Sequence, residues 1–253
     1  MKNLVDLNNK HILILGALSE IGIKTAETLC ELGAKVDIAD KDIELLETQV
    51  NALNGINNHC FEIDLSNIDS IREKLIDAVD AFGKYDGLVY SGENFSGTPL
   101  NSISIDILKE VYNTNCFGFI ESVKEISQEG MYYDGMRIVG VSSIAAFKGM
   151  ESYVGYAGSK ASIDGAVKSL AIELAKKNIC INTISIGFID DKRFNDYRRI
   201  IGEDSVRYKV LLERQASGIG IPQDIANVIA FLLSKASRFI TGQNIIADGG
   251  YSA

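Results

Sequence analysis

The chain has 253 residues, of which 46% are hydrophobic and 23% charged, and its formal net charge is −9. Such a composition is typical of a soluble globular domain with a substantial core, and the acidic balance argues against a general nucleic-acid surface. The two histidines stand far apart in sequence, and the four cysteines are scattered without a CxxC pair, which argues against a metal site or a disulfide framework.

The first ten residues are polar and lack the apolar segment of a signal peptide. No apolar run elsewhere approaches the length of a membrane span. We therefore expect a cytoplasmic protein without a membrane partner.

Short apolar runs alternate with longer segments of helical spacing along the chain. The expected strands are His11–Leu15, Lys35–Ala39, Cys60–Ile63, Gly87–Ser91, Arg137–Ser142, Cys180–Ser185 and Asn244–Ala247. The expected helices are Ile21–Leu32, Ile68–Phe82, Ile105–Gln128, Ser152–Lys176 and Pro222–Leu233. This alternation predicts an α/β fold, a doubly wound parallel sheet in three α/β/α layers. No linker or change of composition divides the chain, so one domain over residues 1–253 is expected.

A glycine-containing turn follows the first expected strand and opens the first helix. Its candidate cofactor-binding residues are Gly16, Ser19, Glu20, Ile21 and Gly22. A strand, a glycine turn and a helix N-terminus with free N–H groups form a binding site for a dinucleotide pyrophosphate. A plain tight turn is the alternative, since two glycines six apart are common.

The second expected strand is followed by Asp40, 24 residues after Gly16. An acid at this place is expected to bind the adenosine ribose and to repel a 2′-phosphate, which favours NAD(H). Lys41 comes next and keeps NADP(H) open. Asp64 and Leu65, after the third strand, have two interpretations: an adenine contact, or a helix-cap region.

Tyr156 and Lys160 are four residues apart on an expected helix and so share one face. A Lys ammonium beside a phenol is expected to lower the phenol pKa, and such a Tyr suits acid–base catalysis on a carbonyl or alcohol. Ser143, near the end of a strand, would hydrogen-bond the same substrate oxygen. Taken alone, the Tyr–Lys spacing also occurs by chance on helix surfaces.

Together these residues resemble the short-chain dehydrogenase/reductase family over nearly the whole chain. Asn115 within Asn113–Gly118, the segment Ile221–Ala226 and the tail motifs Ile240–Gln243 and Asp248–Gly250 add to the resemblance. It implies a Rossmann-type domain with a cofactor half at about 8–135 and a catalytic and substrate half at about 136–253.

The resemblance implies a catalytic tetrad of Asn115, Ser143, Tyr156 and Lys160. Tyr156 would transfer the proton, Ser143 would position the substrate oxygen, Lys160 would hold the nicotinamide ribose, and Asn115 would support a water. A helix-bending polar residue is the alternative for Asn115. The implied cofactor-binding set also includes Tyr156 and Lys160 themselves, with Ser91, Gly92, Gly187, Ile189 and Asp191.

The chain departs from the family pattern, and its glycine motif is divergent. The departures are Leu15, Glu20 in place of the middle glycine, Tyr90–Glu93 after the fourth strand, Ile186 and Asp191. Carboxylates at Glu20 and Asp191 would repel a phosphate if they pointed inward. Alternatively, Glu20 caps the helix and faces solvent.

A lid is expected over about 190–216, where the chain holds seven cations and six acids. Its arginines either recognise an anionic substrate group or form i,i+4 pairs on a solvated helix. The candidate substrate-binding residues are Glu93, Ser143, Tyr153 and Arg198. Tyr153 is a second candidate acid, but only Tyr156 has the Lys one turn later.

The leading functional hypothesis is reversible hydride transfer between NAD(H) and a secondary alcohol or ketone, with 3-oxoacyl, sugar and polyol substrates all open. One alternative is a nucleotide-binding or scaffold protein with impaired catalysis. Another is an epimerase or dehydratase that uses bound NAD. Small residues in the long helices, together with the resemblance, imply self-association as a homotetramer or homodimer.

Overall fold

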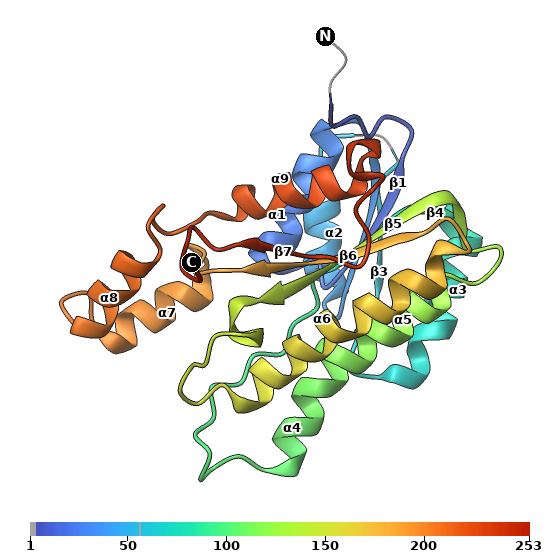
Figure 1. Ribbon diagram of the computed structural model, residues 1–253. Helices are drawn as coiled ribbons and strands as arrows, with labels where there is room; N and C mark the ends of the chain where they lie inside the picture. The colour runs from blue at the N-terminus through green and yellow to red at the C-terminus, as the bar shows by residue number, and fades with distance from the viewer. Residues whose placement is uncertain (1–3, 56) are drawn as a thin grey trace.

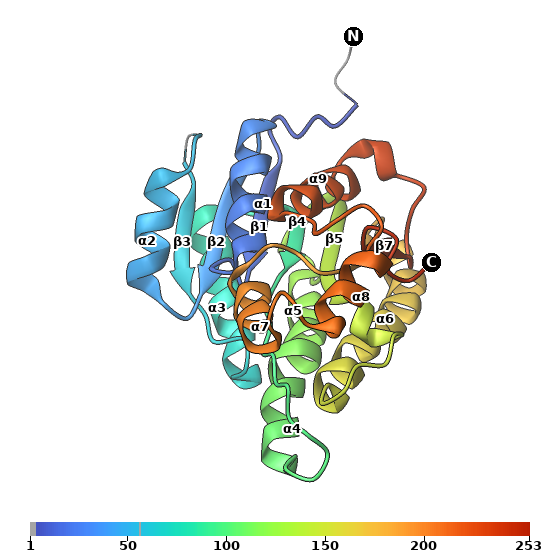
Figure 2. The same cartoon turned by 90° about the vertical axis from the view of Figure 1, so that its left-hand side faces the viewer.

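The structure, a computed structural model, describes residues 4–55 and 57–253 and is built on one seven-stranded sheet (Figures 1 and 2). Every strand pair is parallel, and the spatial order is β3-β2-β1-β4-β5-β6-β7. The strands are β1 (His11–Leu15), β2 (Lys35–Asp40), β3 (His59–Glu62), β4 (Tyr85–Tyr90), β5 (Tyr132–Ser143), β6 (Cys180–Ile186) and β7 (Asn244–Ala247). The predicted doubly wound fold is confirmed.

Helices cover both faces of the sheet (Figures 1 and 2). One face carries α1 (Glu20–Glu31), α2 (Ile43–Ala52) and α9 (Pro222–Leu233). The other carries α3 (Ile68–Phe82), α4 (Ile105–Tyr112), α5 (Gly118–Ile126) and α6 (Val154–Ala175). Beyond the sheet lie α7 (Lys192–Ile201) and α8 (Val206–Arg214), and short turns occupy η1 (Asn113–Phe117), η2 (Ile144–Ala146) and η3 (Lys235–Ser237). No helix in the described part of the chain is long and apolar enough to cross a membrane.

Alternation along the strands divides the core between the two faces. Ile12 and Ile14 of β1 pack with α1 and α9, whereas Leu13 and Leu15 pack with α3 and α5. Successive side chains of a strand point to opposite faces, so a strand covered on both sides is apolar throughout. This explains why the strands were visible in the sequence as short continuous apolar runs.

Two helical segments differ from the sequence prediction. Helix α2 was not predicted. Leu46 is its one buried residue, so the apolar periodicity of this segment is weak. The single helix expected over Ile105–Gln128 contains a π-helical turn, η1, between α4 and α5. There the chain passes so close to the segment after β3 that a Cβ added at Gly118 would lie 2.3 Å from the Leu65 carbonyl oxygen.

A buried carboxylate joins four strands at the amino ends of the sheet. Asp37 is fully buried, and its oxygens lie 2.7 Å from His11 Nε2, 2.9 Å from the Tyr85 hydroxyl and 3.1 Å from His59 Nδ1. Burial alone would raise the Asp37 pKa, but the contacts with His11, Lys35 and Tyr85 outweigh it and lower the pKa. The ionised carboxylate therefore stabilises the packing of β1 to β4.

We predict that Asp37→Asn lowers the free energy of unfolding by about 3 kcal/mol, since one member of a buried charged network is lost. Because the folded-state pKa is depressed, the wild-type advantage is present above a pH of about 4 and is lost as the pH falls through the folded value. Urea unfolding at several pH values measures this. Asp42→Asn is the control, because Asn replaces Asp well at the N-cap of α2. Equal midpoints for wild type and Asp37→Asn would contradict the prediction.

Candidate active site

Three of the predicted catalytic residues meet at the carboxyl end of β5. Ser143 is the last residue of β5, and Tyr156 and Lys160 lie one turn apart near the start of α6. Both α6 side chains are almost fully buried. Ser143 and Tyr156 line one cavity. Tyr156 and Lys160 lie on one face of α6, as their spacing predicted.

Lys160 reaches past the tyrosine ring toward β5. Its Nζ donates to the Val141 carbonyl oxygen over 2.9 Å and lies 5.7 Å from the centroid of the Tyr156 ring. Burial lowers the pKa of Lys160, and the nearby carboxylate of Glu93 opposes that shift. The ammonium is thus close to the phenol without bonding to it directly.

Glu93, a predicted substrate-binding residue, lies in direct contact with the predicted catalytic residues. Tyr156 donates a hydrogen bond of 2.7 Å to Glu93 Oε2, and Lys160 Nζ lies 3.4 Å from the same oxygen. Burial and Glu93 raise the pKa of Tyr156, while Arg193 and Ser143 act in the opposite direction. The expectation that Lys160 leaves Tyr156 with a lowered pKa is therefore wrong for this arrangement, because a carboxylate lies between the ammonium and the phenol.

Asn115 holds the segment that carries Glu93. It lies in the π-helical turn, accepts from the Asn94 backbone N–H at 2.6 Å and donates to the Asn94 carbonyl oxygen at 3.0 Å. A further bond of 2.9 Å reaches the Ser159 hydroxyl on α6. Asn115 thus fixes the backbone beside Glu93 against α6, and the helix-bending interpretation of this residue also agrees with the turn.

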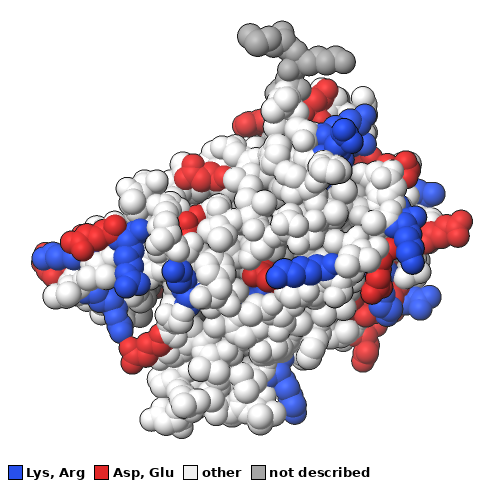
Figure 3. Space-filling view, viewed as in Figure 1, with Lys and Arg blue, Asp and Glu red and all other residues white. Residues whose placement is uncertain are grey.

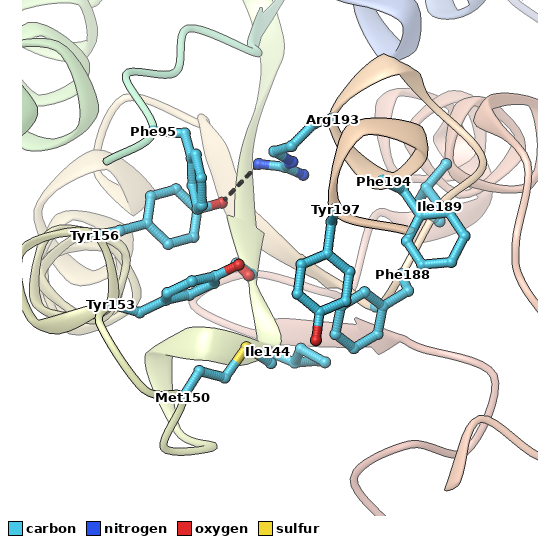
Figure 4. A pocket seen from close by; sticks show the side chains of 12 residues that line it. Phe95, Ile144, Met150, Tyr153, Tyr156, Phe188, Ile189, Arg193, Phe194 and Tyr197 are labelled. Carbon is cyan, nitrogen blue, oxygen red and sulfur yellow. Dashed lines mark hydrogen bonds between the residues drawn. The ribbon is translucent and has the colours of Figure 1, made fainter. Parts of the chain in front are cut away.

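Aromatic rings form the wall of the cavity at Tyr156 (Figure 4). Phe95 lies 5.1 Å from both Tyr153 and Tyr156 in edge-to-face contact, measured between ring centroids. Phe188, Phe194 and Tyr197 line the opposite side. Tyr153 therefore lines the cavity, as the sequence suggested for a substrate-binding residue, and the pocket favours an apolar or flat substrate group.

Among the lid arginines, Arg193 faces the site. It pairs with Glu93, its Nη1 lies 3.3 Å from the Tyr156 hydroxyl oxygen, and its guanidinium lies 5.4 Å from the Phe95 ring centroid (Figure 4). Arg198, predicted as the substrate-binding arginine, instead pairs with Glu203 at 3.3 Å and is not among the lining residues of the cavity. The sequence predicted that an arginine of this charged segment would reach the site. Which arginine points inward depends on the position of each residue around the axis of α7, and this could not be derived from composition.

The glycine turn after β1 meets the turn after β4. Gly16 has φ +75°, and a Cβ added there would lie 2.3 Å from the Gly92 backbone nitrogen. Ser19 caps α1 by accepting from Gly22 N at 3.0 Å, and its hydroxyl lies 2.9 Å from that of Ser91. Ile21 packs into the core.

A groove extends from this glycine turn to Asp40. Gly16, Ser19, Asp40, Leu65, Ser91 and Gly92 are among its lining residues. Its floor is backbone without side chains at two glycines, and Leu65 supplies an apolar wall, so this end fits an adenosine group.

The polar groups at the far end of the groove are already paired. Asp40 accepts from the Leu18 and Lys41 backbone N–H groups at 3.0 and 2.8 Å. Lys41 Nζ lies 3.0 Å from Asp64, whose same oxygen accepts from Ser66. Asp64 thus organises the turn before α3 and neutralises Lys41, which matches the cap-region interpretation better than direct adenine contact.

Two further carboxylates lie where the lid begins. Glu20 is exposed at the start of α1, as the solvent-facing interpretation expected, and its Oε1 also accepts from the Lys192 backbone N–H at 2.9 Å. Asp191 caps α7 by accepting from Phe194 N at 2.7 Å. Gly187 and Ile189 precede Asp191 in the chain and line the aromatic cavity. Both carboxylates border a second pocket that also contains Glu93 and Arg193.

Comparisons with known proteins agree with this geometry. A family profile described as Enoyl-(Acyl carrier protein) reductase matches residues 16–252. The 3-oxoacyl-[acyl-carrier-protein] reductase FabG of Vibrio cholerae is 29% identical over 97% of this chain and 98% of its own length. The corresponding protein of Rickettsia prowazekii is 31% identical, with 98% of each chain covered.

The fold comparison gives the same result. The crystal structure of a dehydrogenase/reductase from Sinorhizobium meliloti has a TM-score of 0.88 and 26% identity, and the alignment covers 98% of this chain and 97% of that one. The match spans the sheet, the glycine turn and the Ser–Tyr–Lys cluster together. The chain belongs to the short-chain dehydrogenase/reductase family of oxidoreductases.

Proposed function

We propose that this protein interconverts a secondary alcohol and a ketone by hydride transfer to or from NAD(H). The observation that carries the proposal is that Ser143 and Tyr156 line one aromatic cavity, next to a groove that fits adenosine. Lys160 lies behind this wall, with its Nζ 5.7 Å from the centroid of the Tyr156 ring. A bound nicotinamide would supply or accept the hydride. Tyr156 would give its proton to the ketone oxygen or take it from the alcohol, and Ser143 would hold that oxygen in place.

Two residues beside Tyr156, Lys160 and Asn115, would support proton transfer through this residue. Lys160 would bind the ribose hydroxyls and stabilise the phenolate that forms when the proton leaves. Asn115 would keep the surrounding backbone in place through Asn94 and Ser159. The names of the relatives make a 3-oxoacyl thioester the first carbonyl compound to test, followed by sugars and polyols.

Tyr156→Phe is expected to lower kcat for ketone reduction by about 10³-fold, the usual contribution of a positioned acid. The matched control is Tyr153→Phe, which removes a hydroxyl from the same cavity and should affect KM more than kcat. Oxidation of NADH with an acetoacetyl thioester provides the measurement. Equal losses in both variants would contradict the role of Tyr156, and substrate conversion without net NADH change would favour epimerisation or dehydration.

We further propose a preference for NAD(H) over NADP(H). Asp40 lies at the end of the groove, and the cation beside it, Lys41, is already paired with Asp64. The local balance of these three charges is negative. A 2′-phosphate would therefore meet net repulsion.

Asp40→Ser is expected to lower the ratio of the NADPH Kd to the NADH Kd by about tenfold, since the like-charge repulsion is reduced. Titration calorimetry with each nucleotide measures the ratio. Asp42→Asn, two residues away and outside the groove lining, should leave it unchanged. A preference for NADPH in the wild type would contradict the assignment.

Self-association through α4, α5 and α6 is proposed as well. The surface over α6 and α4 carries few charged side chains (Figure 3). Ile105 of α4, Phe117 of η1 and Ile172 of α6 are exposed. Exposed apolar residues on adjacent helices are typical of an interface between subunits. A two-fold arrangement of these helices would cover them in a homodimer or homotetramer.

Ile172→Lys is expected to reduce the molar mass measured by light scattering, because a charge would be buried in the interface. Val206→Lys is the matched control, since Val206 is similarly exposed but lies on α8. An unchanged mass for Ile172→Lys would place the interface elsewhere.

A further inference from the structure

One carboxylate occupies both polar groups that the proposed reaction needs. Glu93 Oε2 accepts the Tyr156 hydrogen bond at 2.7 Å and lies 3.4 Å from Lys160 Nζ. A phenol has a single O–H to donate. While Tyr156 donates to Glu93, it has no hydrogen to offer to a ketone oxygen.

The carboxylate is charged in this position. Burial would raise the pKa of Glu93, but Arg193 and Lys160 outweigh burial and lower the pKa to about 2. An ionised group among two cations and a phenol is held firmly. Any ligand that needs Lys160 or Tyr156 must therefore replace these contacts.

The backbone next to Glu93 does not have to move for this replacement. Asn115 holds both the N–H and the carbonyl oxygen of Asn94. The Glu93 side chain itself borders two open spaces, the adenosine groove and the pocket beside Asp191. Rotation of the Glu93 side chain into either space would free Tyr156 and Lys160.

The same carboxylate also ties down the lid. Arg193, in the first turn of α7, pairs with Glu93, and the backbone N–H of the preceding Lys192 donates to Glu20. Glu20 and Glu93 come from different parts of the body of the protein, the start of α1 and the loop after β4. Two adjacent lid residues are therefore held by two carboxylates at the mouth of the site.

We propose that Glu93 is an internal competitor of the nicotinamide cofactor: its carboxylate occupies Tyr156, Lys160 and Arg193, and cofactor binding displaces it. This inference rests on the proposed function, because it assigns Lys160 to the cofactor and Tyr156 to the substrate oxygen. Glu93 then determines the apparent affinity for the cofactor, which is the intrinsic affinity reduced by the fraction of molecules in which Glu93 has moved away.

The test is titration calorimetry of the full chain with NADH. Glu93→Gln keeps the shape of the side chain and removes its charge, and it is expected to lower the NADH Kd at least fivefold. Glu93→Ala provides a second variant with no carboxylate to compete, and its NADH Kd should also be lower than that of the wild type. Thermal unfolding of each variant establishes that it is folded.

The matched control is Glu151→Gln. Glu151 also forms an ion pair between the body and the lid, at 2.7 Å to Arg207, but this pair is exposed and does not line the cavity at Tyr156. Its NADH Kd should stay within about twofold of the wild-type value, as for an exposed ion pair of small energy. An equal gain in Glu151→Gln and Glu93→Gln would overturn the proposal, because loosening the lid alone would explain it.

Two other results distinguish the proposal from the function on which it rests. If the wild type binds NADH and both Glu93 variants bind it equally or more weakly, Glu93 is not a competitor, and the proposed function stands. If neither the wild type nor any variant binds NADH or NADPH, both are overturned. Binding by the Glu93 variants alone would support the competition in its strongest form.

Discussion

The close approach of Gly16 and Gly92 is the constraint on which the rest of the site depends. β1 and β4 are neighbours, but the chain leaves them toward opposite sides of the sheet. Their turns can meet only where neither carries a side chain, since a Cβ at Gly16 would overlap the Gly92 backbone. This crossing point is where an open α/β sheet binds its ligand.

From that crossing the positions of the other groups follow. Leu15 accepts from the Ser91 backbone N–H at 2.8 Å, so the turn after β4 continues in register with β1. Two residues later Glu93 is directed toward α6, where Tyr156 and Lys160 already face β5. The position of the site therefore depends on the order of the strands in the sheet as well as on the residues that line it.

The sequence was sufficient for the fold and for the Tyr–Lys pair because both depend on local spacing. Continuous apolar runs marked the buried strands, and two residues four apart on a helix lie on one face regardless of tertiary structure. Helix α2 was not predicted, because Leu46 is its one buried side chain and a single buried residue produces no apolar periodicity in the sequence.

The contacts of Glu93 and Arg193 were beyond local reasoning. They are 100 residues apart in the chain. They meet because Glu93 follows β4 and Arg193 follows β6, and the carboxyl ends of these parallel strands lie at the same edge of the sheet. Their side-chain directions depend on the π-helical turn at Asn115 and on the phase of α7. Glu93 was noticed as a departure from the family pattern, but its partners could not be derived from that alone.

Both imidazoles of this chain lie at the opposite end of the sheet from the chemistry. His11 and His59 contact Asp37 at the amino ends of the strands, whereas Tyr156 and Lys160 lie beyond the carboxyl end of β5. A reagent that acylates histidine would thus probe the integrity of the sheet and not the occupancy of the active site. Inactivation by such a reagent would accompany loss of structure, and a nucleotide in the groove would protect only by stabilising the fold.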